Sequence, residues 1–328
     1  MGLGEFDRIE KFFKPLAAHS PGALGLSDDA AVLAVAGLAG LVISTDALVE
    51  GVHFRIDDPA ELIARKALRT NLSDLAAMGA EPWVYTLSLA LGPMGGAPVD
   101  PWVAGLAAGL GIDQEKFSIG LIGGDSVSTP GPVMVSITIF GKQGADGVLT
   151  RSGAAAGDDI YVSGTIGDAA LGLKVLSGEL TGLDLESSAM LVDRYHLPRP
   201  RVDLGMALAG CASAAMDVSD GLAQDLAHLC KASGVAGEIS LNDVPLSRAT
   251  GMLLADGLAG VEDIFGGGDD YELLFTAPPS ARESVERRAE LAGTPVCRIG
   301  GIDAGQGVTV RDGAGQLVPI GRRGYRHA

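Results

Sequence analysis

The first half of the chain alternates apolar runs of strand length with longer segments of helix length. Leu41 to Ser44 and Trp83 to Leu91 are rich in Leu, Val and Ile and predict strands. Pro59 to Met78 and Pro101 to Leu110 predict helices. Pro132 to Phe140 alternates Val, Ser, Ile, Thr and Ile, which predicts a strand with one buried face.

Local signals mark where these helices begin and end. Asp58-Pro59 and Asp100-Pro101 each place a capping carboxylate before a proline that suits the first helical turn. Gly79 and Gly111 stand where helices commonly stop. The segment Gly141 to Gly147 then predicts a linker, after which the alternation starts again.

The second half repeats the pattern of short apolar runs and helical segments. In chain order, the predicted elements are a strand Ile160 to Ser163, a helix Asp168 to Leu176, a strand Ala212 to Val218, a helix Leu222 to Ala232, and strands Tyr271 to Thr276, Val296 to Ile299, Val308 to Arg311 and Leu317 to Ile320. A chain of 328 residues exceeds one typical core. We therefore predict a mixed α+β fold of two domains, residues 1–145 and 146–328.

Composition predicts a compact protein that works in the cytoplasm. Aromatic residues make up only 5% and glycines number 48, which fits small-residue packing and tight turns. Met1 to Lys14 lacks a basic region followed by an apolar core, so no secretory signal is expected there. Ala30 to Ile43 is shorter than the ~20 residues of a membrane helix. Cys211, Cys230 and Cys297 are odd in number and widely spaced, which predicts packing residues rather than disulfides or a zinc site.

The net charge of -17 changes what the chain can bind. It excludes nucleic-acid binding through a generally basic surface. It would also repel a polyanionic substrate, unless metal ions and a few placed arginines or lysines reverse the local field. Metal ions therefore become part of any prediction of phosphate chemistry.

Seven short acidic patches stand out, most of them at the end of an apolar or glycine-rich run. They are Ser27-Asp28-Asp29, Ser44-Thr45-Asp46, Asn71-Leu72-Ser73-Asp74, Gly123-Gly124-Asp125, Gly157-Asp158-Asp159, Asp217-Val218-Ser219-Asp220 and Gly268-Asp269-Asp270. Carboxylates that converge must take up protons or bind divalent cations, and oxygen-only ligands suit magnesium best. The patches predict a magnesium cluster and, with it, phosphate chemistry.

Two patches lie on predicted regular elements of the first half. The strand from Leu41 to Asp46 ends in two hydroxyls and a carboxylate, which can hold a metal ion or simply begin a turn. Asn71 and Asp74 share one face of a helix that is otherwise lined by Leu and Ala. An aspartate among apolar residues needs a partner, either a metal ion or a basic neighbour on the surface.

Three further segments can be interpreted either as ligand-binding or as purely structural. Gly123-Gly124-Asp125 lets the backbone approach a phosphate, or forms a plain turn. Arg151 is either a phosphate clamp or a surface ion pair. Asp217 to Leu222 joins a buried strand to a helix start, where the acids can face a metal ion while Ser219 and the first amides face a phosphate. Helix capping by Ser219 or Asp220 is compatible with that role.

The remaining candidates are less specific. A single histidine such as His53 is more often a structural donor than a catalyst, so no general base is assigned. Gly266 to Glu272 joins three glycines to three acids, as a ligand loop or as a hairpin turn. Asp158-Asp159 is expected to cap a turn and is left out of the site. The chain contains no GxxxxGKS/T loop, no GxGxxG helix start, no HExxH and no GxSxG, so it is not a conventional P-loop kinase.

Nine motifs, taken in order, resemble those of the thiamine-monophosphate kinase family over nearly the whole chain. They are Gly4-Glu5-Phe6, Ser27 to Ala31, Ser44-Thr45-Asp46, Gly51 to Phe54, Asn71 to Gly79, Gly123-Gly124-Asp125, Thr150 to Gly153, Asp217 to Leu222 and Asp269 to Leu273. That family belongs to the superfamily of aminoimidazole ribonucleotide synthetase, whose members bind ATP without a P-loop. The resemblance implies an N-terminal αβ domain that binds metal and ATP and pairs through its sheet in a homodimer. It also implies a C-terminal α/β sandwich that completes the ATP and substrate site.

By the same resemblance, the chain would transfer the γ-phosphoryl group of ATP to thiamine monophosphate. The implied magnesium ligands are Asp29, Ser44, Thr45, Asp46, Asp74, Asp125, Asp217 and Asp220. The implied ATP contacts are Gly124, Asp125, Arg151 and Ser219, and the implied substrate contacts are His53, Asp269 and Arg322. Because the acceptor is already an ionised phosphate oxygen, no strong base is required.

Three positions depart from the family pattern. Ser27 stands where a glycine is usual, and Asp269 where a glutamate is usual. Arg322 aligns with a tryptophan that stacks on the substrate. Two alternatives remain: another ATP-using synthetase of the superfamily, and a non-catalytic metal-binding relative. The absence of a reactive N-terminal cysteine, together with His53 and Asp269, favours the kinase over a selenophosphate synthetase.

Overall fold

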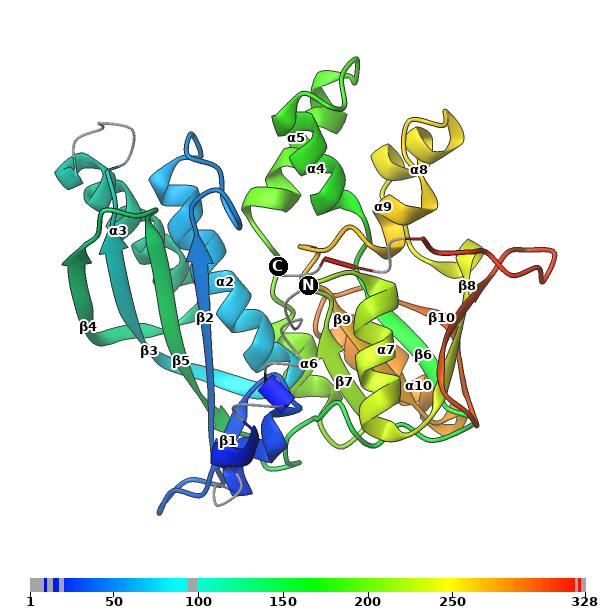
Figure 1. Ribbon diagram of the computed structural model, residues 1–328. Coiled ribbons are helices and arrows are strands. Elements are labelled where there is room, and N and C mark those ends of the chain that lie inside the picture. Colours follow the sequence, from blue (N-terminus) through cyan, green and yellow to red (C-terminus); the bar gives the residue numbers. More distant parts are fainter. Residues whose placement is uncertain (1–8, 11–13, 18–20, 94–98, 322–323, 326–328) are drawn as a thin grey trace.

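The computed structural model describes residues 9–10, 14–17, 21–93, 99–321 and 324–325. The chain forms two α+β halves, each built on its own β-sheet, which lie side by side (Figure 1). Between residues 9 and 30 the regular structure includes the short 3-10 helices Lys14–Ala17 and Pro21–Leu26. None of the described helices is both long and apolar enough to cross a membrane.

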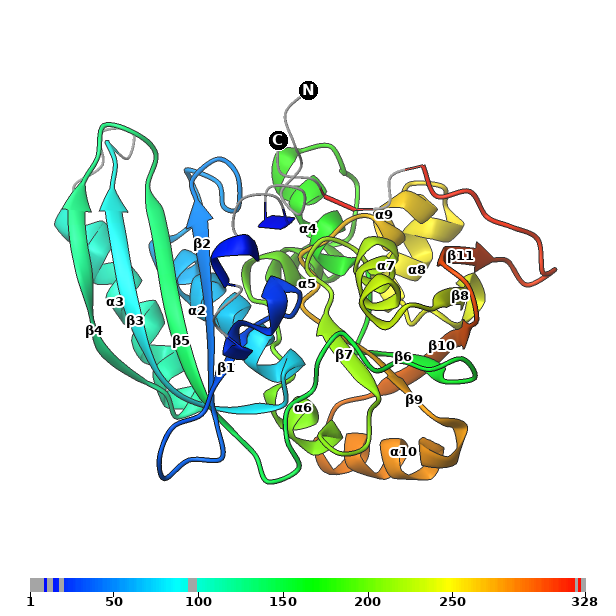
Figure 2. The same ribbon diagram turned by 60° about the horizontal axis from the view of Figure 1, so that its bottom comes forward.

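The first sheet has five strands in the order β1-β2-β5-β3-β4. Their bounds are Ala31–Leu33 for β1, Leu41–Val49 for β2, Ala80–Leu91 for β3, Gly120–Ser128 for β4 and Met134–Gln143 for β5. Neighbouring strands are antiparallel except for the parallel pair β3 and β4. Helices α2 (Ala60–Ala77) and α3 (Val99–Phe117) cover one face, and Figure 2 shows the other face of the strands free of helices.

The period-two pattern of the strands decides which face is covered. On β5, Val135, Ile137 and Ile139 are fully buried, whereas the intervening Ser136 and Thr138 point to the opposite face. Leu68 and Leu72 are completely buried on α2, in the same core. The helix-covered face is therefore the apolar core of this half, and the other face carries the hydroxyl-bearing residues.

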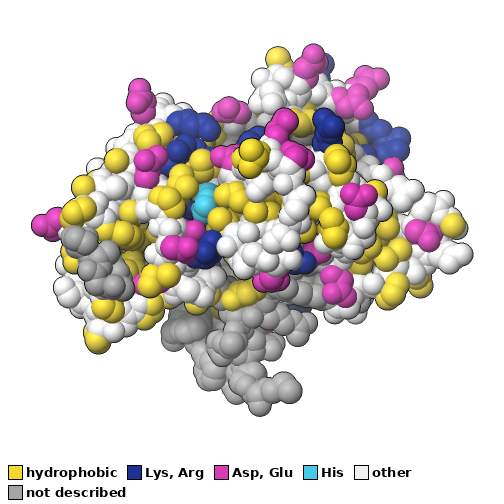
Figure 3. Space-filling model, turned by 90° about the horizontal axis from the view of Figure 1, so that it is seen from above, with side chains coloured by type: hydrophobic (Ala, Val, Ile, Leu, Met, Phe, Trp, Pro, Cys, Tyr) yellow, Lys and Arg dark blue, Asp and Glu magenta, His cyan; other side chains and the backbone are white. Residues whose placement is uncertain are grey.

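The second sheet has six strands in the order β11-β8-β10-β6-β9-β7, antiparallel except for the pair β8 and β11. The strands are β6 (Asp159–Ser163), β7 (Ala214–Asp217), β8 (Ala236–Ser240), β9 (Leu273–Ala277), β10 (Val296–Asp303) and β11 (Gly307–Arg311). The helices are α4 (Asp168–Ser177), α5 (Leu185–His196), α6 (Val202–Leu208), α7 (Leu222–Ser233), α8 (Arg248–Ala255), α9 (Val261–Phe265) and α10 (Arg282–Leu291). Short 3-10 helices cover Leu241–Asp243 and Pro279–Ala281. Seen from above, the surface carries scattered Asp and Glu side chains with a few groups of Lys and Arg (Figure 3).

The predicted two-domain α+β architecture is confirmed, with two mixed sheets. The helix predicted from Pro59 to Met78 matches α2 almost residue for residue, and Gly79 ends it with φ +66°. Each predicted strand other than Leu317 to Ile320 lies on an observed strand, although bounds differ by several residues. The boundary between residues 145 and 146 stays a prediction.

Several local predictions were wrong. The helix α3 runs through Gly111 to Phe117, because Gly111 lies on the exposed side, where nothing forces a stop. The segment from Leu317 to Ile320 is not a strand: only Leu317 forms an isolated bridge, with Arg311, while Val318 and Ile320 pack against the second core. The predicted linker at Gly141 starts too early, since β5 continues to Gln143. The strand β4 was not predicted at all.

The helix α2 fixes the two halves against each other. On α6, Gly205 packs so closely on α2 that a Cβ there would lie 2.0 Å from the carbonyl oxygen of Ala76. Arg69 donates two hydrogen bonds to Asp113 of α3, at 2.6 and 2.8 Å, and one to the carbonyl of Pro198 at 3.0 Å. Both Arg69 and Asp113 are buried. This ion pair therefore joins α2 to α3 and to the chain that follows α5.

We predict that Asp113→Asn lowers the free energy of unfolding by about 3 kcal/mol, because it leaves the Arg69 charge buried without its carboxylate. Urea unfolding followed by circular dichroism measures the loss. The exposed pair of Arg55 and Asp57 provides the control, and Asp57→Asn should change stability by less than about 1 kcal/mol. Equal, small losses in both variants would contradict the role given to the buried pair.

Candidate active site

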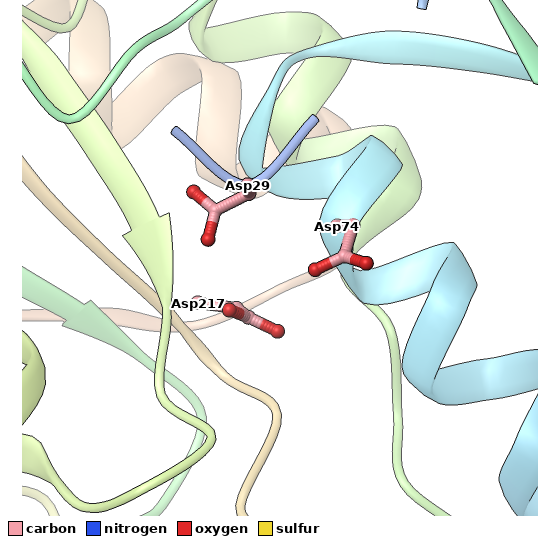
Figure 4. A group of neighbouring side chains, drawn as sticks. All are labelled: Asp29, Asp74 and Asp217. Atoms are coloured by element: carbon pink, nitrogen blue, oxygen red, sulfur yellow. The ribbon is translucent and has the colours of Figure 1, made fainter. Parts of the chain in front are cut away.

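Three carboxylates from distant parts of the sequence meet between the two sheets. One oxygen each of Asp29, Asp74 and Asp217 lies within 4.8 Å of the other two (Figure 4). Asp29 precedes β1, Asp74 lies in the last turn of α2, and Asp217 is the last residue of β7. Three of the seven acidic patches thus converge.

Strand pairing and two serine hydroxyls hold these carboxylates in place. The register of β1 on β2 pairs Ala31 with Ile43, which brings Asp29 beside Ser44. The Ser44 hydroxyl lies 3.1 Å from the Asp29 carbonyl oxygen and also hydrogen-bonds the Asp74 carboxylate. Ser73 donates to Asp217 at 2.6 Å. One oxygen of Asp74 and one of Asp217 are thereby occupied, and the other of each is left for a ligand.

The cluster is electrostatically costly without a cation. Burial is the main cause that raises the pKa of Asp74 well above its ordinary value, and the charges of Asp46, Asp217 and Asp29 add to it. Burial, followed by the charge of Asp29, raises the pKa of Asp217 to about 7. Asp74 also stands at the carbonyl end of α2, where the helix dipole disfavours a negative charge. A bound cation would remove each of these costs.

One arginine neutralises only part of this charge. The Arg151 guanidinium hydrogen-bonds Asp29 Oδ1, and the Arg151 amide donates to Asp28 at 2.6 Å. Asp29 Oδ2 is buried and has no hydrogen-bond partner among the described residues. An unpartnered buried carboxylate oxygen beside two further carboxylates is a donor set that fits a divalent cation with oxygen ligands.

Asp46 borders the cluster, but Thr45 faces away from it. Alternate residues of β2 point to opposite faces, so Ser44 and Asp46 share the side of α2. The Asp46 amide donates to the Asn71 side chain of α2 at 3.1 Å. Thr45 lies 3.0 Å from Thr138 across the helix-free face of the sheet. The neighbouring predicted ligands are therefore divided between the two faces.

Gly124 and Asp125 also lie away from the cluster. They belong to the edge strand β4, where Asp125 pairs with Ser88 of β3, and Ser88 with Ser136 of β5. Ser136 in turn pairs with Ala47 of β2. Asp125 is thus three strand spacings from β2, roughly 14 Å, and its side chain points to the helix-free face. Within one chain, Asp125 does not join the acid cluster.

The loop after Asp217 is held by a residue that was not among the predicted site residues. Asp225, fully buried in α7, accepts hydrogen bonds from the amides of Asp220 and Gly221 at 3.1 and 3.0 Å. Burial is the main cause that raises its pKa well above its ordinary value, and Asp220 and Asp217 contribute. The signal for this role is a carboxylate in the first turn of a helix that follows an acidic loop. Asp225 thereby fixes the backbone between Asp217 and the start of α7.

A second group of predicted residues meets around Lys66, which was also missed. Lys66 Nζ donates to Asp269 at 2.8 Å and to the His53 carbonyl at 3.1 Å, and it lies 3.8 Å from the centre of the Tyr195 ring. The lysine side chain is only 3% exposed. Lys66 thus links the His53 backbone to the Asp269 carboxylate, whereas Arg322 lies outside the described residues; the substrate contacts of all three stay predictions. A basic residue on the apolar face of α2 was the available signal for Lys66.

The loop that carries Asp269 joins the two groups. The Asp269 amide donates to the carbonyl of Ser219 at 2.8 Å, and the Tyr271 amide donates to the carbonyl of Val218 at 2.8 Å. Asp269 and Tyr271 have φ of +64° and +48°, a conformation that residues with a side chain seldom adopt. Burial, followed by the charge of Asp269, raises the pKa of the Tyr271 phenol well above its ordinary value, so it stays protonated. Ser219 therefore lies between the acid cluster and Asp269.

The patch excluded from the site has a structural role. Asp158 accepts a hydrogen bond from the Ala155 amide at 3.0 Å and caps that turn, as predicted. Asp159 pairs with Arg282 at 2.7 Å and with Arg298 at 3.3 Å. These carboxylates are satisfied within the second half.

Comparisons with known proteins agree on one family. The model described as AIR synthase related protein, N-terminal domain, matches residues 27–143, and its C-terminal counterpart matches residues 155–313. Thiamine-monophosphate kinase of Caulobacter vibrioides is 41% identical over 98% of this chain and 90% of its own length. The enzyme of Salmonella typhimurium is 40% identical over 100% and 99%.

A solved structure agrees over the same length. AaThiL complexed with AMPPCP and TMP superposes with a TM-score of 0.84 at 31% identity, covering 100% of this chain and 99% of its own. Full-length relatives and full-length structural similarity lead to the same assignment. The chain belongs to the thiamine-monophosphate kinase family.

Proposed function

We propose that this chain transfers the γ-phosphoryl group of ATP to thiamine monophosphate, which gives thiamine diphosphate and ADP. The observation that carries the proposal is the convergence of Asp29, Asp74 and Asp217 in a chain of this family. The relatives are named for the reaction, and the AaThiL structure contains AMPPCP and TMP. A buried acid cluster is what two polyanionic substrates require if cations are to bring them together.

The cations would be held by the converging carboxylates. One oxygen each of Asp29, Asp74 and Asp217 lies within 4.8 Å of the other two. Asp46 is close enough for its charge to raise the pKa of Asp74 and of Asp217, and Asp220 is kept as a proposed further ligand. Bound magnesium ions would neutralise phosphoryl oxygens and align donor and acceptor. Ser44 and Ser73 keep the carboxylates oriented through their hydroxyl groups. A cation on the unpartnered Oδ2 of Asp29 would leave Arg151 on Oδ1, next to the proposed phosphate site.

The nucleotide is proposed to lie along the loop after Asp217. The Ser219 hydroxyl is the proposed donor next to the cluster, whereas the amides of Asp220 and Gly221 donate to Asp225, which keeps the backbone rigid. Arg151 supplies the fixed positive charge on the other side of Asp29. These donors bind phosphate oxygens without a P-loop.

The acceptor is proposed to bind at the group around Lys66. Asp269 is paired with Lys66 in the free protein, and a thiamine cation is an alternative partner for the carboxylate. If Asp269 paired with the thiamine cation, Lys66 would be free to bind the acceptor phosphate. The ionised oxygen of that phosphate can attack without a general base. His53 lines the same place, and Arg322 is retained as a proposed contact.

A homodimer is proposed to complete the site. The edge strand β4 and its neighbours expose Leu121, Ile122, Val127 and Trp83, each between 44 and 62% exposed. An uncovered sheet face with a long apolar edge strand is suited to pairing with a second copy. If the helix-free faces of two copies pack on each other, Asp125 of the partner subunit would face the side of the sheet that carries Thr45, and the two would be candidates to hold a further magnesium ion. Gly124 would approach the nucleotide from the same strand.

We predict that purified protein with Mg-ATP releases ADP and forms thiamine diphosphate when thiamine monophosphate is added, and not when thiamine replaces it. A coupled ADP assay with product chromatography measures both. Asp46→Asn and Asp74→Asn should lower turnover by orders of magnitude without loss of folding, because cation binding depends on these carboxylates.

The matched control is Asp57→Asn, which removes an exposed carboxylate and should keep full turnover. If no thiamine diphosphate forms, the proposed reaction is wrong. ADP release that is independent of thiamine monophosphate would instead indicate another ATP-using enzyme of the superfamily. Unchanged turnover in both cluster variants would remove these residues from the site.

We predict that the metal-free protein loses stability as pH rises from about 4 through 7. The pKa of Asp217 is about 7 in the folded protein against an ordinary 3.8, so the folded state holds the proton more tightly. The resulting stability is fully present below 3.8 and is lost as pH rises through 7, a loss of roughly 4 kcal/mol. Magnesium binds the ionised form and should raise the melting temperature more at pH 8 than at pH 5.

Thermal unfolding in EDTA and in magnesium, at both pH values, measures these effects. Asp217→Asn is the control and should show a smaller difference between the two pH values. A magnesium effect that is equal at pH 5 and pH 8 would contradict the coupling of cation binding to the acid cluster.

We predict that mixing two inactive variants, Asp74→Asn and Asp125→Asn, restores activity after subunit exchange. If Asp125 acts across the dimer, each mixed dimer contains one site with both carboxylates, so random exchange restores about a quarter of the sites. The ADP assay before and after exchange by mild denaturant and dialysis measures the recovery. Absence of recovery, with mixed dimers demonstrated by differential tags, would show that Asp125 does not act in the partner's site.

A further inference from the structure

A cavity of about 440 Å³ lies in the second half, away from the acid cluster. Its walls come from α5, from the chain between α5 and α6, and from α8, including Met190, Arg199 and Met252. In Figure 1, the helix pair α4 and α5 and the pair α8 and α9 both rise above the second sheet. None of the residues given a role in the proposed reaction lines this cavity.

The deepest basic group of the cavity has unsatisfied donors. The Arg194 side chain is 3% exposed. Its Nη2 donates to Glu272 at 2.8 Å and to the Asp270 carbonyl at 3.3 Å. Arg194 Nε and Nη1 are also buried, and no described residue accepts a hydrogen bond from them. Buried charged donors without an acceptor are costly, which indicates a ligand that completes them.

The carboxylate behind Arg194 is shared and cannot neutralise it alone. Arg201 donates to both oxygens of Glu272, each at 2.6 Å, and Ser163 donates a third hydrogen bond at 2.6 Å. Two guanidinium groups therefore face one carboxylate. Arg199 and Arg248 line the same cavity at its exposed rim and add two positive charges. That of Arg199 is shared with Asp193 in an exposed ion pair at 3.4 Å.

Two of the acids in the wall already accept hydrogen bonds from the protein's own donors. Asp168 accepts hydrogen bonds of 2.6 Å from three hydroxyls, those of Thr165, Ser247 and Thr250. Asp184 caps α5 by accepting from the Ser187 amide and hydroxyl at 2.9 and 2.7 Å. Glu186 is exposed at the rim. The lining thus has four arginines against three acids, and the Nε and Nη1 donors of Arg194 are left without an acceptor among the described residues.

We propose that this cavity binds the phosphate group of a small organic phosphate. Phosphate offers several acceptor oxygens and two negative charges, which matches converging guanidinium groups better than a single carboxylate does. Arg194 binds it at depth, and Arg199 and Arg248 close over it from the rim. Met190 and Met252 supply an apolar wall for the organic part.

Titration calorimetry on metal-free protein tests the proposal independently of the reaction. Without magnesium, the acid cluster repels phosphate, so binding reports on the cavity. Glycerol 3-phosphate should bind saturably with one site per chain, more tightly than inorganic phosphate, and glycerol should not bind. Arg199→Gln and Arg248→Gln should each weaken binding about tenfold, since each removes a charged donor.

The control is Arg287→Gln, which removes an equally exposed arginine from α10 and should leave the affinity unchanged. Unchanged affinity in both cavity variants, or loss of binding in Arg151→Gln, would overturn the proposal, because the phosphate would then lie elsewhere. Absence of saturable binding would overturn it as well. Binding of inorganic phosphate alone would overturn the assignment of an organic ligand. None of these outcomes depends on whether the chain phosphorylates thiamine monophosphate.

Discussion

The mutual repulsion of buried carboxylates is the constraint on which the site depends. Asp29, Asp74 and Asp217 lie within 4.8 Å of one another in surroundings that raise the pKa of two of them. An apolar residue in place of any one of these three aspartates would reduce the repulsion. A cation bound between the carboxylates would offset this cost. The folded protein thus has a place that favours positive charge, and perturbed carboxylates of this kind are typical of functional sites.

The rest of the architecture keeps these groups from moving apart. Asp29 directly precedes β1, Asp74 lies on α2 and Asp217 ends β7, so relative motion of these elements would separate the three carboxylates. The helix α2 limits that motion, because it packs in the core of the first sheet and meets α6 of the second half at Gly205. The buried pair of Arg69 and Asp113 ties the same helix to α3. A helix shared between the halves is therefore both the scaffold and the source of Asp74 and Lys66.

The fold could be predicted from the sequence where one face of an element is buried and the other is not. The segment of β5 has such periodicity, and its position was predicted well. The helix α2 is buried on nearly every side between Ile63 and Ala77, and it was predicted from its length and from the signals at its ends. The strand β4 has no alternation, because as an edge strand with many glycines it buries neither face in one chain. The segment from Leu317 to Ile320 is apolar because it packs on the core, not because it pairs in the sheet. Local pattern cannot distinguish these two causes.

The site was predictable only as far as each residue carried its own signal. Acids that follow apolar runs mark Asp29, Asp74 and Asp217 as candidates from the sequence alone. Lys66 has a weaker signal, a basic residue in an apolar helix, and the sequence does not show its partner Asp269, which is 203 positions away in the chain. The division of Ser44 and Thr45 between two faces follows from strand geometry, but only once the neighbours of β2 are known. Proximity across the fold is the information that the sequence pattern lacks.

The most direct test of the account is a crystal structure of the protein soaked with manganese, with anomalous scattering used to locate the ions. We predict an ion between the carboxylates of Asp29, Asp74 and Asp217, with oxygen ligands only. An empty cluster at saturating manganese, with ions bound only elsewhere, would contradict it.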